Sequence, residues 1–226
     1  MSAFMAKVYD DRIEMLSDGA QYDENTGALK SIERKVWHAE RLPLAVTGRG
    51  ASGNVEFVAK QFTRRADEAS SVDEALEEIE FLANFYAAIN APCPAFELLV
   101  AAISETDGPQ LLHLVSEDVY GTGRERYSIA ACEDLVVAGA SSEADFDGFN
   151  LQDGLREAAL PIFNNMRRHK HVPLGAPACP AIHAVGGHID LTIVRRDGCT
   201  VERIHVWPED KVGEKIVPGL RAYATT

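Results

Sequence analysis

The sequence has no apolar run that approaches the ~20 residues needed to cross a bilayer. The first residues, MSAFMAKVYDD, have neither the basic region nor the apolar region of a secretory signal peptide. These two absences predict a cytoplasmic protein with no membrane partner.

Cysteine and positive charge are also scarce. The four cysteines, at positions 93, 132, 179 and 199, show no C-x-x-C spacing, which excludes a recognisable disulfide framework or zinc knuckle. Only 22 basic residues stand against 35 acidic ones, for a net charge of −13. That charge matches nucleic acid and anionic membranes poorly, so we expect neither as a partner. The cysteines are interpreted as small apolar residues.

Apolar residues make up 46% of the 226 residues, which is enough for a sizeable core. Periodicity predicts strands, two helices, more strands, one helix and final strands. This order is typical of an α+β protein, because regular βαβ alternation and internal repeats are missing. We expect one domain over residues 1–226, although residues 172–181, with three prolines and a glycine, are the best linker candidate.

Three helices are predicted. The first covers Gly53 to Phe62, and a charged connector follows it from Thr63 to Ser70. Ser71-Val72-Asp73-Glu74 fits a capping box and begins the second helix, whose apolar face extends to Ile89. The third covers Leu151 to Arg168, and Pro161 is expected to kink or divide it.

The predicted strands come in neighbouring pairs with turn residues between several of them. They cover residues 3–9 and 13–17, 31–38 and 42–47, 96–103 and 111–115, 127–132 and 135–138, and 189–194 and 201–206. The segment 31–38 carries Lys35.

The stretch LPLAVTGRGASGNVEF, Leu42 to Phe57, predicts a buried strand that turns sharply into a helix. Glycines at such a corner leave backbone N–H groups free to face a ligand. Two chemistries use this arrangement, namely an oxyanion hole beside a nucleophile and a phosphate cradle. The segment Gly48 to Gly53 also satisfies G-x-G-x-x-G, but a dinucleotide site requires a βαβ unit around it. Nucleotide binding is therefore the weaker alternative.

The order and spacing of several short motifs resemble the N-terminal-nucleophile hydrolases, specifically proteasome β-subunits and their bacterial HslV relatives. The matching residues are Ser2 after removal of Met1, Asp18 in Leu-Ser-Asp, Lys35 in Arg-Lys-Val, and Gly48 in Thr-Gly-Arg-Gly. The resemblance covers nearly the whole chain. It implies a four-layer αββα sandwich and a homo-oligomer.

The resemblance also implies a mechanism for peptide or amide hydrolysis without a cofactor. Ser2 would be the nucleophile, and its α-amino group, with a reference pKa of about 7.7–8.0, the general base. Asp18 and Lys35 would support it, and the Gly48 amide would stabilise the oxyanion. Arg49 and Gly50 would contact substrate, although Arg49 could instead fill the site.

Two alternatives stay open. If Met1 is retained, Ser2 has no free amine, and the chain is then interpreted as a non-catalytic assembly or scaffold protein of the same fold. The pairs His169/His171 and His188/Asp190 supply potential metal ligands, but without a third ligand at fixed spacing they are interpreted as surface or core residues.

Overall fold

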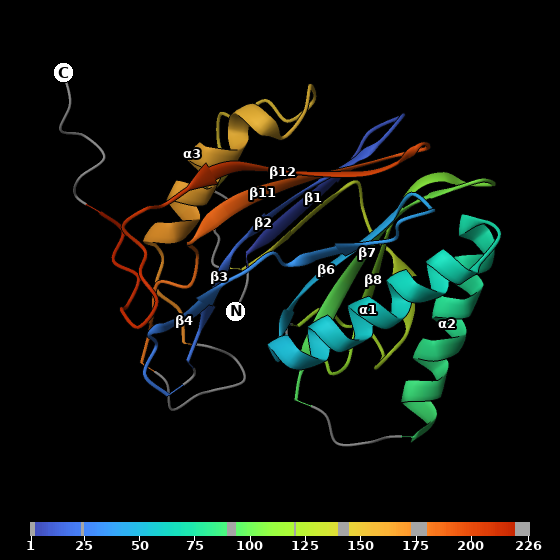
Figure 1. Ribbon diagram of the computed structural model, residues 1–226, viewed down its shortest axis with the longest axis horizontal. Helices are drawn as coiled ribbons and strands as arrows, with labels where there is room; N and C mark the ends of the chain where they lie inside the picture. Colours follow the sequence, from blue (N-terminus) through green and yellow to red (C-terminus); the bar gives the residue numbers. More distant parts are fainter. Residues whose placement is uncertain are drawn as a thin grey trace.

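The protein is an α+β fold built from two five-stranded antiparallel sheets, a two-stranded hairpin and three α-helices (Figure 1). The computed structural model describes residues 3–23, 25–89, 94–119, 121–139, 145–172 and 180–219. Within these ranges the helices are α1 (Ser52–Glu68), α2 (Val72–Ile89) and α3 (Arg156–Arg168). No helix in the described ranges is both long and apolar enough to cross a membrane.

The first sheet has the strand order β10-β1-β2-β11-β12. Its strands are β1 (Phe4–Val8), β2 (Ile13–Asp18), β10 (Leu135–Ala138), β11 (His188–Arg195) and β12 (Gly198–Val206). β1 and β2 form the N-terminal hairpin, and β2 pairs on its other side with β11. The first and last parts of the described chain therefore share one sheet.

The second sheet has the order β5-β6-β7-β8-β9. Its strands are β5 (Val36–His38), β6 (Leu44–Gly50), β7 (Phe96–Ser104), β8 (Gly108–Val115) and β9 (Ile129–Ala131). The separate hairpin, β3 (Ala20–Tyr22) and β4 (Leu29–Ile32), connects the first sheet to the second.

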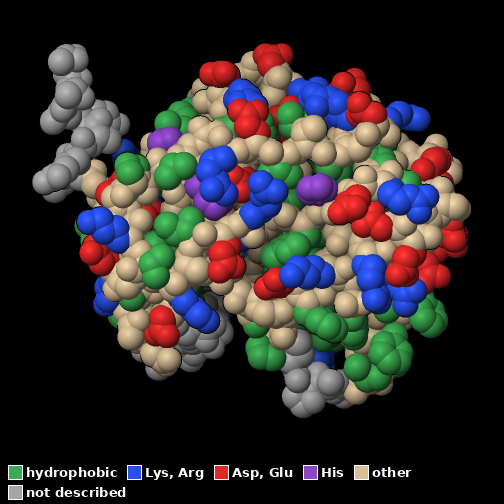
Figure 2. Space-filling model, viewed as in Figure 1, with side chains coloured by type: hydrophobic (Ala, Val, Ile, Leu, Met, Phe, Trp, Pro, Cys, Tyr) green, Lys and Arg blue, Asp and Glu red, His purple; other side chains and the backbone are tan. Residues whose placement is uncertain are grey.

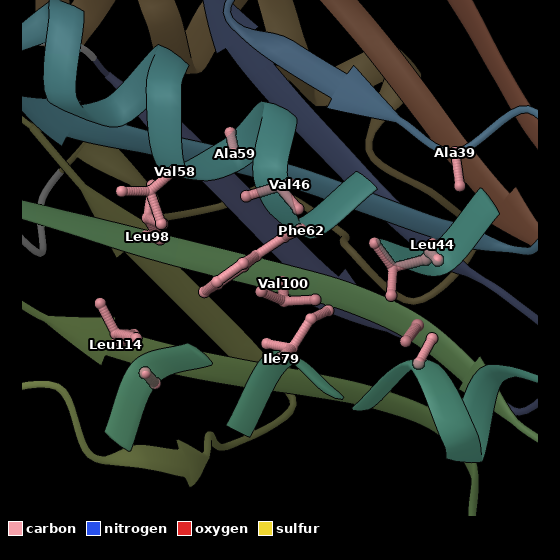
Figure 3. Packing of buried hydrophobic residues seen from close by; sticks show 14 of the residues in the cluster. Ala39, Leu44, Val46, Val58, Ala59, Phe62, Ile79, Leu98, Val100 and Leu114 are labelled. Atoms are coloured by element: carbon pink, nitrogen blue, oxygen red, sulfur yellow. The ribbon is translucent and has the colours of Figure 1, made fainter. Parts of the chain in front are cut away.

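Each sheet carries helices on one face. The apolar sides of α1 and α2 pack on the second sheet, where Phe62 and Ile79 meet Val46, Leu98 and Val100 (Figure 3). α3 packs on the first sheet through a different cluster that includes Phe163 and Leu191. The two helical groups therefore cover different sheets.

A third apolar cluster draws on both sheets and lies between them. It joins Ile13 and Val194 from the first sheet to Leu99, Ala101 and Leu111 from the second. Because side chains alternate along a strand, Ser17, Glu97 and Asp190 continue these rows and face the same space, whereas Asp18 and Gly48 lie one position out of phase with them. There the apolar side chains give way to polar ones, and the candidate site lies next to this end, on the α1 side of the second sheet.

The predicted α+β class and most predicted elements are confirmed. Four details were wrong. α1 continues through the expected connector to Glu68, because Phe62, Thr63 and Ala66 extend its buried face. α3 begins at Arg156 rather than Leu151; it is continuous across Pro161, so of the two expected effects, a kink or a division, the division does not occur.

The other two corrections concern the segment around Lys35. The expected strand 31–38 is two strands, β4 and β5, and Lys35 lies in the bend between them. β3 was not predicted, since its three residues are too few to show a period. Most of the linker candidate, residues 173–179, lies outside the described residues.

We predict that Phe62→Ala lowers the free energy of unfolding by about 3–5 kcal/mol, because the Phe62 ring is fully buried between α1 and the second sheet. Phe57→Ala on the same helix is the matched control, since Phe57 is 57% exposed. It should change stability by no more than about 0.5 kcal/mol. Urea unfolding of both variants measures the difference, and equal losses would contradict the packing described.

A second prediction concerns Gly48, where β6 approaches β7. A Cβ at this position would overlap the Glu97 carbonyl oxygen and lie 2.7 Å from Leu98 Cδ2. Gly48→Ala should therefore destabilise the protein by about 1–3 kcal/mol. Gly53→Ala should be neutral or stabilise by up to about 1 kcal/mol, because Gly53 is helical with no atom near its Cβ position. A Gly48→Ala variant as stable as Gly53→Ala would rule out this close approach.

Candidate functional site

The carboxylate of Asp18, at the end of β2, is the centre of the candidate site. Asp18 is completely buried. Its Oδ1 accepts hydrogen bonds from Ala3 N at 3.0 Å and from Lys35 Nζ at 2.8 Å. Its Oδ2 accepts from Ala20 N and Gly186 N, both at 3.1 Å. One side chain thus joins β1, the start of β3, the bend before β5 and the segment before β11.

Lys35 is the cation of this arrangement and is 4% exposed. Its Nζ also donates to the Ala20 carbonyl, and its own carbonyl accepts a hydrogen bond from Thr47 Oγ1 at 2.9 Å. Burial lowers the pKa of Lys35 below its ordinary value, while the charge of Asp18 and the hydrogen bond to it act in the opposite direction. The ammonium group therefore depends on Asp18 for its charge.

A narrow cleft brings Lys35 and the glycine corner together. Its lining residues are Gln21, Lys35, Trp37, Gly48, Arg49, Gly50, Ser52 and Val55. The cleft volume is about 20 Å³, which is room for one water-sized group. The structure thus places Lys35 and Gly48 around one small space, and Asp18 is connected to that space through its hydrogen bond with Lys35.

The glycine corner extends beyond its neighbouring strand. β5 begins at Val36, opposite Thr47, so no described strand pairs with the last three residues of β6 on that side. Gly50 has a φ of 116°, a conformation that other residues rarely adopt. Backbone groups at this end of β6 are therefore not used by a sheet ladder on the cleft side.

Arg49 lines the cleft but is bound by a buried carboxylate. Its Nε donates to Glu97 on β7, and the other oxygen of Glu97 lies 3.2 Å from His113 Nε2 on β8. Since Glu97 is 2% exposed, its charge requires such partners. Arg49 accordingly fills part of the corner. Sequence reasoning missed Glu97 and His113, and the only signal was a charged residue at the start of a strand that is otherwise apolar.

A second buried polar row lies on β11 and β12. Asp190 is fully buried, and its oxygens lie 3.1 Å from His188 Nε2 and 3.0 Å from Arg203 Nε. Burial acts to raise the pKa of Asp190, but hydrogen bonds from His188 and Arg203 hold it below its ordinary value. His188 Nδ1, Ser17 Oγ and Thr192 Oγ1 are buried there without a hydrogen-bond partner.

The histidines therefore have structural surroundings that differ from a metal site. His188 belongs to the ion-pair row, and His169 Nε2 lies 2.9 and 3.0 Å from the two oxygens of Asp145. Across the ranges that the structure describes, no group of three or more His, Cys, Asp or Glu residues could hold a metal ion.

Ser2 itself lies outside the described residues. It is covalently bonded to the nitrogen of Ala3, which is the atom that donates to Asp18 Oδ1. Of the other predicted residues, Asp18 thus binds the backbone nitrogen that follows the expected nucleophile in the chain. A dinucleotide site requires a βαβ unit around the glycine motif. Here β6 is followed by two helices and pairs antiparallel with β7, so Gly48 to Gly53 do not lie in such a unit.

No protein-family model matches the chain, and no curated protein matches its sequence.

Proposed function

We propose that this protein is an amide or peptide hydrolase of the N-terminal-nucleophile type, with Ser2 as its nucleophile. The observation that carries the proposal is the position of the Lys35–Asp18 ion pair. Asp18 binds Lys35 and the first described backbone nitrogen, that of Ala3, with the same oxygen. Buried ion pairs with a perturbed pKa, placed beside a cleft, are typical of catalytic sites.

The arrangement of helices and sheets supports the same proposal. α1 and α2 pack on one sheet, α3 packs on the other, and an apolar cluster lies between the sheets. We infer a four-layer αββα sandwich in a single domain, the architecture that the resemblance to proteasome-like hydrolases implies.

In the proposed reaction the Ser2 hydroxyl attacks the carbonyl carbon of an amide, and the free α-amine of Ser2 takes the hydroxyl proton. The ammonium of Lys35 favours loss of that proton through its positive charge, and Asp18 fixes the ammonium in place. Backbone N–H groups at Gly48 stabilise the oxyanion. The amine then protonates the leaving nitrogen, and water hydrolyses the resulting ester of Ser2.

The size of the cleft defines the proposed substrate further. A volume of about 20 Å³ beside Lys35 and Gly48 admits only a small group next to the scissile carbonyl. Gly50 and Arg49 contact the substrate at the mouth, with Arg49 acting through shape because Glu97 already balances its charge. No cofactor enters this chemistry.

The second candidate function is a non-catalytic assembly or scaffold protein with the same fold. The narrowness of the cleft and the bound Arg49 side chain favour it, since both reduce the space that an acyl group needs. The two functions can be distinguished by the N-terminus: the hydrolase requires that Met1 is removed, and the scaffold protein does not.

We predict that the untagged protein lacks Met1 and gains the mass of one adduct after exposure to a peptide epoxyketone or β-lactone. These electrophiles react with an N-terminal hydroxyl activated by its own amine. Intact mass spectrometry measures both changes, and peptide mapping should place the adduct on Ser2. Retained Met1 without an adduct would refute the hydrolase and favour the scaffold.

We further predict that Lys35→Met slows adduct formation at Ser2 at least about 100-fold, because the charge that favours the ionised nucleophile is lost. Lys60→Met is the matched control: Lys60 is exposed on α1 and pairs there with Glu56, so its loss should leave the rate unchanged. Circular dichroism establishes that both variants fold. A folded Lys35→Met variant that reacts at the wild-type rate would restrict Lys35 to a structural role.

A further inference from the structure

A second cavity, with lining residues that differ from those of the cleft at Gly48, lies where three parts of the chain meet. Its volume is about 170 Å³. Its walls come from Gly27 in the turn between β3 and β4, from Lys170 and residues 181–183 after α3, and from residues 215–217 after β12. Figure 1 shows these parts together, with the end of α3 above the β3–β4 hairpin and the red C-terminal segment beside both. This space is called the basic cavity below.

The walls of the basic cavity are held in place by backbone contacts. His171 and Ile182 exchange two hydrogen bonds of 2.9 Å, which hold the segment after α3 against the segment before β11. Leu29 N donates to the Glu214 carbonyl at 2.8 Å and so joins the C-terminal segment to β4. A Cβ at Gly27 would overlap Ile182 Cγ2, so the turn packs directly on Ile182. The cavity is therefore preformed by the fold.

The titratable groups that line the basic cavity are all basic. Lys170 and Lys215 are exposed, and His183 is half-buried. Among the residues that the structure describes, no carboxylate lines the cavity or forms an ion pair with either lysine. Over the face drawn in Figure 2, by contrast, acidic and basic side chains are interspersed, and the whole chain has a net charge of −13. Like charges that share one cavity repel each other, and a bound anion offsets that repulsion.

The two lysines supply the positive charge. Burial lowers the pKa of His183 below its ordinary value, the hydrogen bond to the Arg167 carbonyl opposes this shift, and the charge of Lys170 adds to it. The His183 ring is therefore neutral at neutral pH. An anion in the basic cavity is thus bound through the ammonium groups of Lys170 and Lys215.

The inner side of the basic cavity is apolar. Ile182 and Ile216 both line it and are only 5% and 6% exposed. Val217, which is 69% exposed, continues the apolar lining toward the surface. A site with apolar walls and a few charged groups at one side suits a ligand that has a charged end and a short hydrocarbon part.

We propose that the basic cavity binds a small aliphatic carboxylate, with the carboxylate group paired with Lys170 and Lys215 and the hydrocarbon part against Ile182 and Ile216. Because a water molecule occupies about 30 Å³ of the liquid, the cavity accommodates roughly five to seven non-hydrogen atoms. The branched carboxylate 3-methylbutanoate has this size. A phosphate ion matches the charge but leaves the two isoleucines uncovered. The inference does not depend on the proposed hydrolase chemistry.

Isothermal titration calorimetry of the full chain at constant ionic strength tests the proposal. We expect 3-methylbutanoate to bind with a Kd of roughly 0.1–1 mM. It should bind at least about tenfold more tightly than acetate, inorganic phosphate or the neutral 3-methylbutanamide, because each of these lacks either the hydrocarbon part or the charge. Acetate or phosphate that binds equally well would show that the isoleucines are not used. Equal binding of the amide, or no binding of 3-methylbutanoate at about 10 mM, would also overturn the proposal.

Variants locate the bound carboxylate. Lys170→Gln and Lys215→Gln should each weaken binding of 3-methylbutanoate at least about fivefold, because a charge-assisted contact is lost. Lys60→Gln is the matched control and should bind as the wild type does, since Lys60 is exposed on α1.

A steric variant tests the same location without removing charge. Ala181 is exposed and lines the basic cavity, so Ala181→Trp should fill the space and abolish binding. Ala88→Trp is its control, because Ala88 is exposed on α2. Circular dichroism establishes that each variant folds. Folded lysine variants that both bind as tightly as the wild type, or binding that survives Ala181→Trp, would overturn the proposal.

Discussion

The rest of the site depends on the buried ion pair between Asp18 and Lys35. A carboxylate without exposure is tolerated only when its lone pairs are matched, and Asp18 has four donors. Those donors come from segments that are far apart in the sequence, including Gly186. Loss of one charge would leave the other buried and unpaired, at a cost of about 3–5 kcal/mol. The pair therefore fixes the N-terminal strand, the bend before β5 and the start of β11 in one arrangement.

The same constraint explains why the space between the sheets has two chemical halves. One half is closed by apolar side chains such as Met15, Leu99 and Val194. The other half holds Glu97 with Arg49 and Asp190 with Arg203, and the pair of Asp18 and Lys35 lies beside it at the end of β2. Each of these buried acids has a cation as its partner. The charges are therefore balanced within each pair, although the whole protein carries a net negative charge. A fold that needed only stability would use apolar residues there, because they pack as well at lower desolvation cost.

The sequence predicted what depends on local pattern. The apolar face of α2, the Asp-Gly turn before β12 and the hairpin at the N-terminus each appear within a few residues, and all three are present. The bend that carries Lys35 was missed because the partners of this segment are distant in the sequence: Lys35 binds Asp18, 17 residues away. Glu97 and His113 were missed for a related reason: they become partners only when β7 and β8 pair. The spacing of residues in the sequence does not indicate such contacts.

The residues of this site can be present without catalysis, because the carboxylate of Asp18 has all of its hydrogen-bond donors whether or not a nucleophile is present. The four hydrogen bonds to its carboxylate come from Lys35 and from backbone nitrogens, and none uses a side chain of residue 2. The arrangement around Asp18 therefore does not depend on catalytic activity. A free amine at Ser2 would add a proton acceptor to a site that already holds a positive charge and a glycine corner. Removal of Met1 is thus the step that would convert a structural ion pair into catalytic machinery.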